Sequence, residues 1–244
     1  MPSSRLSLVF LGLLLILPAP AGSTDFAAAR AALVDELRAY GRHDPPPGQD
    51  GFSARVLETL REVERHQFVP ESLQSEAYLN HPLPIGHGQT ISQPYIVALM
   101  TDLVAPDADD VVLEVGTGSG YQAAVLAKLV GQVYSIEIIE PLAEQAKVRL
   151  ARLGYDNVTV KCGDGYAGWV EHAPFDRIIV TCAPPKVPAP LIEQLADSGR
   201  MVVPVGEFWQ ELVLIEKFGD EIRESNIIPV RFVPMTGDGV QKDD

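Results

Sequence analysis

The sequence predicts an α/β fold in which helices cover a mostly parallel sheet, and three observations support this. From Asp110 onward, short apolar segments alternate with helical ones, which is typical of strands that pair in parallel through helical crossovers. A glycine-rich turn over residues 116–120 follows the first of these strands and opens a helix. The strands after Gly206 have no helix between them, so we expect them to pair antiparallel.

The periodicity of the apolar residues assigns the elements in order. We predict helices over residues 26–40, 54–67, 95–104, 121–130 and 141–153. We predict strands over residues 111–115, 132–138, 158–161, 177–181, 201–205 and 212–217. Gly41 is the predicted stop of the first helix, and the successive prolines within residues 43–51 predict a loop. The whole pattern predicts a Rossmann-like sandwich with a helical N-terminal extension.

The first 21 residues are predicted to be a secretory signal. Arg5 precedes an apolar run over residues 6–17, and Ala19 and Ala21 are the small residues at positions −3 and −1 of a cleavage site. The run is short for a membrane span, and the alternatives are an uncleaved anchor or a mis-assigned start. We therefore expect an exported protein, periplasmic or secreted, that has no stable membrane association once the signal is cleaved.

The remaining residues, 22–244, are predicted to form a single domain. Its helical extension and the Gly- and Pro-rich segment occupy residues 22–105, and the core with its C-terminal strands occupies residues 106–244. No Lys/Arg-rich run interrupts a chain that has 33 acidic and 19 basic side chains, so we expect no nucleic-acid partner. The five histidines and two cysteines show no metal-ligand spacing, and we expect no metal.

Cys162 and Cys182 follow the third and fourth strands of the parallel unit. In the doubly wound strand order 3-2-1-4, those strands are three spacings apart, or roughly 14 Å. A disulfide needs Cα atoms within about 7 Å. We therefore expect both thiols to be unpaired.

The glycine-rich turn is the most informative segment for function. Glycines 116, 118 and 120 allow a tight turn after the strand and a close approach of the backbone to a ligand. NAD-binding chains have a related pattern, but the spacing here is G-x-G-x-G and not G-x-G-x-x-G. Glu114 lies within the apolar strand, where a carboxylate is costly without a partner. The ammonium group of an amino-acid moiety would suit it.

Two further carboxylates end the next two strands. Glu137 is placed where an acid can accept hydrogen bonds from both hydroxyls of a ribose, a need that NAD and S-adenosylmethionine share. Asp164 could accept a hydrogen bond from an adenine amino group. Each acid alone could be a solvated loop carboxylate, but three acids at successive strand ends around one glycine turn favour a nucleoside site.

Several segments resemble the protein-L-isoaspartate (D-aspartate) O-methyltransferase family. They are residues 84–94 (PIGHGQTISQP), 112–127 (VLEVGTGSGYQAAVLA), 163–165 (GDG), 178–181 (IIVT), 204–206 (PVG) and 231–234 (RFVP). The glycine turn is generic to methyltransferases, whereas the GQTISQP segment is specific to this family. Cys182 departs from the pattern, which has Ala there.

The resemblance implies a Rossmann-like, S-adenosylmethionine-dependent protein repair methyltransferase that acts on the free α-carboxylate of L-isoaspartyl and D-aspartyl residues. It implies that Ser92 is the active-site residue, that Thr90 and Ile91 flank the sulfonium, and that Gln89 helps to cover the cofactor. The other cofactor-binding residues it implies are Glu114, Gly116, Thr117, Gly118, Glu137, Asp164 and Gly165. Ser92, Val205 and Gln210 would face the substrate. Proteins and peptides that contain isoaspartyl residues are the implied partners of a monomer.

Alternatives remain open at this point. Ser92 could be a plain N-cap of the helix over residues 95–104. The protein could methylate a small molecule, could be a non-catalytic binding module, or could be an NAD-dependent oxidoreductase. The family is usually cytoplasmic and its cofactor is made in the cytosol, so a cytoplasmic location is the alternative to export if the leader is not used.

Overall fold

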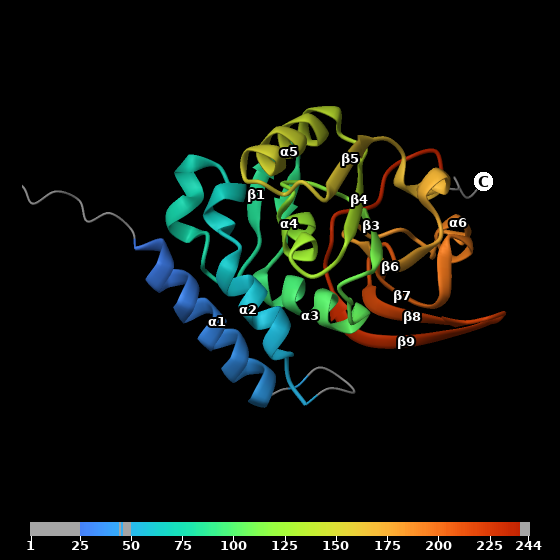
Figure 1. Ribbon diagram of the computed structural model, residues 1–244, viewed down its shortest axis with the longest axis horizontal. Coiled ribbons are helices and arrows are strands. Elements are labelled where there is room, and N and C mark those ends of the chain that lie inside the picture. The colour runs from blue at the N-terminus through green and yellow to red at the C-terminus, as the bar shows by residue number, and fades with distance from the viewer. Residues whose placement is uncertain (1–24, 44, 46–49, 240–244) are drawn as a thin grey trace, which may run out of the picture.

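The computed structural model describes residues 25–43, 45 and 50–239, and a seven-stranded sheet forms its centre (Figure 1). The strand order is β5-β4-β3-β6-β7-β8-β9. Its strands are β3 (Val111–Val115), β4 (Gln132–Glu137), β5 (Val158–Cys162), β6 (Phe175–Val180), β7 (Leu195–Val205), β8 (Gln210–Phe218) and β9 (Glu221–Val230). Strands β3 to β7 pair in parallel, and β7-β8-β9 pair antiparallel. The predicted fold class is confirmed.

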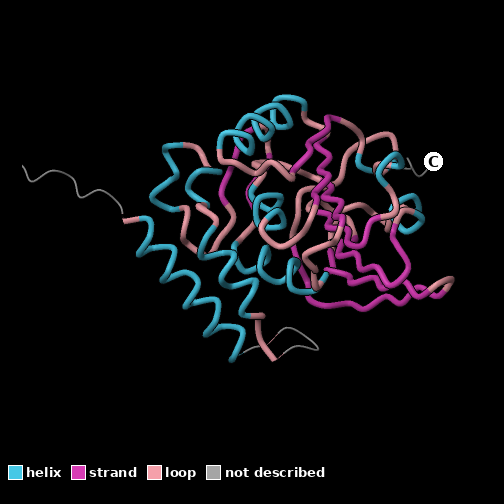
Figure 2. The backbone as a smooth tube through the Cα atoms, viewed as in Figure 1, coloured by secondary structure: helices cyan, strands magenta, loops and turns pink. Residues whose placement is uncertain are grey.

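Strand β3 lies inside the sheet, between β4 and β6, and apart from Glu114 its residues are apolar on both faces. Val112 packs into a core beneath the helices α3 (Pro94–Val104), α4 (Tyr121–Ala127) and α5 (Glu140–Arg152). Leu113 packs into a second core on the opposite face. That face is covered more thinly, by short helices and loops that include η3 (Gly165–Ala167), η4 (Val170–His172) and α6 (Ala189–Glu193). Figure 2 shows this unequal distribution of helix around the sheet.

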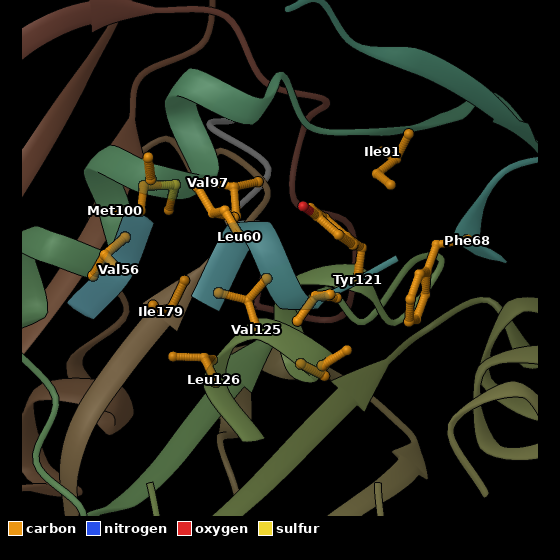
Figure 3. Packing of buried hydrophobic residues seen from close by; sticks show 14 of the residues in the cluster. Val56, Leu60, Phe68, Ile91, Val97, Met100, Tyr121, Val125, Leu126 and Ile179 are labelled. Carbon is orange, nitrogen blue, oxygen red and sulfur yellow. The ribbon is translucent and has the colours of Figure 1, made fainter. Parts of the chain in front are cut away.

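The N-terminal extension packs onto the first core. It contains α1 (Phe26–His43), α2 (Ala54–Glu62), η1 (Arg65–Phe68) and η2 (Glu71–Glu76). Val56 and Leu60 of α2 are buried in the same cluster as Tyr121 and Val125 of α4 (Figure 3). The predicted stop at Gly41 was wrong: α1 extends three residues beyond the predicted range, and Gly41 is buried inside it against Phe52. The second predicted helix ends early, since Val63 has extended backbone.

A two-stranded hairpin, β1 (Leu83–Gly86) and β2 (Gln89–Ile91), forms where the sequence showed no periodicity. His87 adopts a left-handed conformation at its tip, with φ of 52°. The hairpin leads directly into α3. It therefore places the GQTISQP segment beside the carboxyl ends of the parallel strands.

The first four strands of the sheet have the predicted order 3-2-1-4, and Cys162 and Cys182 are both free. No helix among the described residues is both long enough and apolar enough to cross a membrane. The predicted signal, residues 1–21, lies outside the described residues, as does part of the proline loop. Export therefore stays a prediction.

Candidate active site

Two adjoining cavities open at the carboxyl ends of the parallel strands, where ligands bind in such sheets. The first, which we call the cofactor cavity, encloses about 580 Å³ of space between atoms, a volume that includes the open solvent at its mouth. It is lined by Gln89, Thr90, Val115, Gly116, Gly118, Ile136, Glu137, Ile138, Ile139, Gly165, Thr181, Cys182, Val233, Pro234, Met235 and Thr236. The second, which we call the acceptor cavity, contains Ser92 and Gln210. Thr90, Thr181 and Val233 line both cavities, so the two spaces meet along a shared wall.

The glycine turn forms the floor of the cofactor cavity. Gly116 has a φ of 97°, and a Cβ added there would collide with the hydroxyl of Thr181. The N–H groups of Gly116 and Thr117 both donate to the carbonyl of Ile136, at 2.8 and 3.2 Å. The turn is therefore fixed against β4, and only glycine fits at position 116.

Glu137 links the glycine turn to the turn that follows β4, and both turns face the cofactor cavity. Its carboxylate accepts hydrogen bonds from Gly118 N–H at 2.7 Å and from Ile139 N–H at 2.9 Å. The side chain is buried but lines the cavity. Each carboxylate oxygen has a further lone pair, so Glu137 can still accept hydrogen bonds from ligand hydroxyls.

Glu114 lies beneath the glycine turn and does not line the cavity. Its side chain is 0% exposed, and one oxygen accepts a hydrogen bond from the Ser135 hydroxyl. The Ser135 hydroxyl also lies 2.5 Å from that of Thr117, so Thr117 too points into this network and away from the cavity. The other carboxyl oxygen, Oε1, has no hydrogen-bond partner among the described residues. Burial, together with the charge of Glu137, raises the pKa of Glu114 to about 8.

We expect the stability of the protein to depend on pH through Glu114. In the unfolded chain its pKa is about 4.3, so between that value and about 8 the folded protein holds a proton that the unfolded chain has lost. The stabilisation is complete below the lower value and is lost as pH rises through the upper one. Glu114→Gln should remove this loss, so the variant should gain about 3 kcal/mol relative to the parent between pH 5.5 and 9.

Urea unfolding of both proteins at pH 5.5, 7 and 9 measures this difference. Glu140→Gln is the matched control, because Glu140 is an exposed carboxylate at the start of α5. A difference between Glu114→Gln and the parent that stays constant with pH would show that Glu114 is ionised throughout.

Asp164 caps η3 and does not line the cofactor cavity, whereas Gly165 does. The carboxylate of Asp164 accepts hydrogen bonds from Tyr166 N–H and Asp238 N–H, both at 2.8 Å. A Cβ added at Gly165 would collide with the side chain of Val115. Asp164 therefore holds the C-terminal segment around Asp238 next to the cavity. Its contact with adenine stays a prediction.

The GQTISQP segment divides its side chains between the core and the two cavities. Gln89 and Thr90 line the cofactor cavity, and Ser92 lines the acceptor cavity. Ile91 is 4% exposed and packs in the apolar core, so only its neighbours face the cavities (Figure 3). The N-cap of α3 is Gln93 and not Ser92. Within the described part of the chain the Ser92 hydroxyl has no hydrogen-bond partner, which leaves it available to a ligand.

Gln210 joins the start of β8 to the segment that follows β9. Its side chain accepts a hydrogen bond from Phe232 N–H at 2.6 Å and donates one to the carbonyl of Phe232 at 3.2 Å. Gln210 lines the acceptor cavity, while Val205 lines neither cavity. The amide therefore shapes the wall of the acceptor cavity in addition to any contact with a substrate.

The model of the family described as Protein-L-isoaspartate(D-aspartate) O-methyltransferase matches residues 30–240. The chain belongs to this family. It is 54% identical over 239 residues to protein-L-isoaspartate O-methyltransferase 2 of Syntrophobacter fumaroxidans, covering 93% of this chain and 96% of the relative. It is 58% identical to protein-L-isoaspartate O-methyltransferase 2 of Polaromonas sp., covering 84% of this chain and 99% of the relative.

Solved structures of the isoaspartate methyltransferase family have the same fold. A protein-L-isoaspartate O-methyltransferase superposes with a TM-score of 0.77 at 32% identity, covering 85% of this chain and 66% of that one. A putative Plasmodium falciparum protein-L-isoaspartate O-methyltransferase, solved in complex with S-adenosyl-L-homocysteine, gives a TM-score of 0.71 at 24% identity. It covers 85% of this chain and 98% of its own.

Part of the wall of the cofactor cavity was not predicted from the sequence. Residues 233–236 line it because Ala183 pairs with this segment, through hydrogen bonds of 2.8 Å to the carbonyl of Val233 and from Met235 N–H. Cys182, where the family pattern has Ala, also lines the cavity. Burial and the charge of Glu137 raise the pKa of its thiol to about 12, so it stays protonated and a poor nucleophile at neutral pH. The described residues contain no cluster of three or more potential metal ligands.

Proposed function

We propose that this protein transfers a methyl group from S-adenosylmethionine to the free α-carboxylate of L-isoaspartyl and D-aspartyl residues in damaged proteins and peptides. Membership of the isoaspartate methyltransferase family supports the reaction. The observation that carries the proposal is the shared wall of Thr90, Thr181 and Val233, because it brings a nucleoside-type cavity into contact with one that contains an unpartnered serine hydroxyl. A methyl donor and its acceptor must meet in this way.

The residues of the cofactor cavity fit S-adenosylmethionine. Gly116 and Gly165 line the cavity, and a Cβ at either position would collide with a neighbouring side chain, so backbone rather than side chain forms this part of the wall. Glu137 has lone pairs to accept hydrogen bonds from the ribose hydroxyls, and Ile138 and Ile139 provide an apolar wall. Glu114 Oε1 below the turn also has no hydrogen-bond partner among the described residues, but Glu114 does not line the cavity, so its contact with the amino-acid part of the cofactor stays a prediction. When bound, the cofactor supplies an electrophilic methyl group on a positively charged sulfur.

The acceptor needs no general base, because a chain-terminal type of carboxylate has a pKa near 3.5 and is ionised at neutral pH. Ser92 would donate its free hydroxyl to one carboxylate oxygen and so orient the other toward the shared wall. Negative charge on the acceptor is neutralised during transfer, so strong hydrogen bonding would favour the reactant over the transition state. Orientation and proximity, which can contribute roughly 7–11 kcal/mol, are therefore the main sources of rate.

The rim of the acceptor cavity favours an extended peptide over a small metabolite. Phe208 and Trp209, in the turn between β7 and β8, are each 93% exposed and both line this cavity. This turn requires glycine at position 206, because Gly206 has a φ of 123° and an added Cβ would collide with the carbonyl of Trp209. Large apolar groups held in solvent at a cavity mouth are typical of sites that bind proteins or peptides.

Transfer of labelled methyl from S-adenosylmethionine to a synthetic isoaspartyl peptide tests the proposal. The control is the peptide of the same sequence with a normal aspartyl linkage, which keeps the charge and changes only the backbone connection. We expect labelling of the isoaspartyl peptide alone. Equal labelling of both peptides, or of neither, would refute the proposed acceptor.

A further inference from the structure

Arg231 is the only lysine or arginine side chain that lines either cavity in the described part of the chain. It lies just beyond the end of β9, is exposed, and has no hydrogen bond, ion pair or ring contact with another described residue. Other arginines of the sheet have acidic partners, such as Arg200 with Glu216 at 2.8 Å and Arg223 with Glu221 at 2.7 Å. The chain has 33 acidic and 19 basic side chains, so a guanidinium without an acidic partner is unusual here. In the acceptor cavity it is available to bind an anionic ligand.

The backbone of Arg231 is held on both sides. Val230 pairs with Gln210 in the β8-β9 register, and the Gln210 side chain makes two hydrogen bonds to the backbone of Phe232. The side chain of Arg231 is therefore attached to a rigid wall of the cavity. Binding a ligand at the guanidinium therefore requires ordering of the side chain but no further ordering of the backbone.

The charge around Arg231 otherwise opposes an anionic substrate. Glu211 is the one acidic residue among those lining the acceptor cavity, and its carboxylate lies more than 4.0 Å from the guanidinium, since no ion pair forms between them. The whole chain has a formal net charge of −14. An isoaspartyl carboxylate therefore approaches a repulsive surface, and Arg231 is the local group that offsets this repulsion.

We propose that Arg231 is the electrostatic anchor that captures the substrate carboxylate, while Ser92 orients the reacting oxygen. This inference rests on the proposed function. Methyl transfer removes the negative charge of the acceptor, so a guanidinium bound tightly to the reacting oxygen would slow the reaction. An exposed arginine on the cavity wall acts at longer range. It strengthens the binding of substrate and transition state alike, which lowers KM and leaves kcat unchanged.

Steady-state kinetics of Arg231→Gln with an isoaspartyl peptide test this division of roles. We expect KM to rise roughly threefold to tenfold, and kcat to stay within about a factor of two. Arg231→Lys should recover most of the affinity. Added salt screens the attraction of Arg231 and the repulsion of the acidic surface alike, so the kcat/KM of Arg231→Gln should increase with salt relative to that of the parent.

Arg223→Gln is the matched control. Arg223 is also exposed on β9 and its loss changes the net charge by the same amount, but it lines neither cavity. It should keep the kinetics of the parent. The same rise in KM for Arg223→Gln would assign the effect to net charge and overturn the role of Arg231.

A binding experiment separates charge recognition from a structural effect. Calorimetry with S-adenosylhomocysteine present compares the isoaspartyl peptide with its isoasparaginyl counterpart, in which the α-carboxylate is a neutral carboxamide. Arg231→Gln should weaken binding of the first peptide only. Equal weakening of both peptides, or no weakening of either, would overturn the inference while leaving the proposed function intact. If the parent protein fails to methylate the isoaspartyl peptide, the proposed function fails and this inference fails with it.

Discussion

Glu137→Ala is expected to abolish detectable binding of S-adenosylmethionine while leaving the fold intact. The substitution removes the acceptor of the Gly118 and Ile139 N–H groups, and with it the predicted acceptor of the ribose hydroxyls. Hydrogen bonds to a charged group contribute about 1.5–3 kcal/mol each, so the loss of two corresponds to an affinity at least about 100-fold weaker. Isothermal titration calorimetry with S-adenosylmethionine measures the effect, and circular dichroism reports the fold.

Glu140→Ala is the control for this substitution, since Glu140 is an exposed carboxylate only three positions further along the chain. It should bind the cofactor as the parent does. Unchanged affinity in Glu137→Ala would remove Glu137 from the cofactor site, despite its place in the cavity wall.

Ser92→Ala is expected to lower kcat by about 10-fold to 100-fold, with cofactor affinity and stability unchanged. Its hydroxyl caps no helix and has no partner among the described residues, so the folded protein loses no contact when it is removed. The reaction loses the group that orients the acceptor oxygen toward the methyl donor, and loss of part of the contribution of orientation accounts for a change of this size. Single-turnover kinetics, cofactor titration and urea unfolding measure the three quantities separately.

Ser53→Ala is the control for a purely structural role, because it should lower stability and leave turnover unchanged. Ser53 is a true N-cap, because its hydroxyl accepts the Val56 N–H of α2 at 3.2 Å. Its removal should cost about 1 kcal/mol of stability without altering turnover. If Ser92→Ala instead behaves like Ser53→Ala, Ser92 has a structural role.

The parts of the fold that could be predicted from the sequence are those whose pattern is set by local burial. Strand β3 has the predicted bounds because all but its first residue are buried. Strand β9 was missed, since most of its residues from Glu221 to Asn226 are polar and exposed, and only pairing with β8 makes them a strand. The β1-β2 hairpin depends on pairing between Leu83 and Ile91, which periodicity over so few residues cannot show.

The same distinction applies to the candidate site. Glu137 could be predicted because a parallel strand ends there and the strand order places that end at the cavity. The alternation of side chains along an extended segment explains why Thr90 faces the cavity and Ile91 the core. The contribution of residues 233–236 depends on their pairing with Ala183, about 50 positions earlier, and no local pattern encodes that contact.

The wall of the cofactor cavity combines residues from Gln89 to Thr236, and this has a consequence for biosynthesis. A ribosome delivers the chain from its N-terminus, so the cavity cannot close until position 236 has been made and its segment has docked beside Ala183. The parallel strands alone, though synthesised earlier, lack that wall. S-adenosylmethionine would therefore bind only the finished fold, and a ligand that binds only the native state stabilises all of it by mass action.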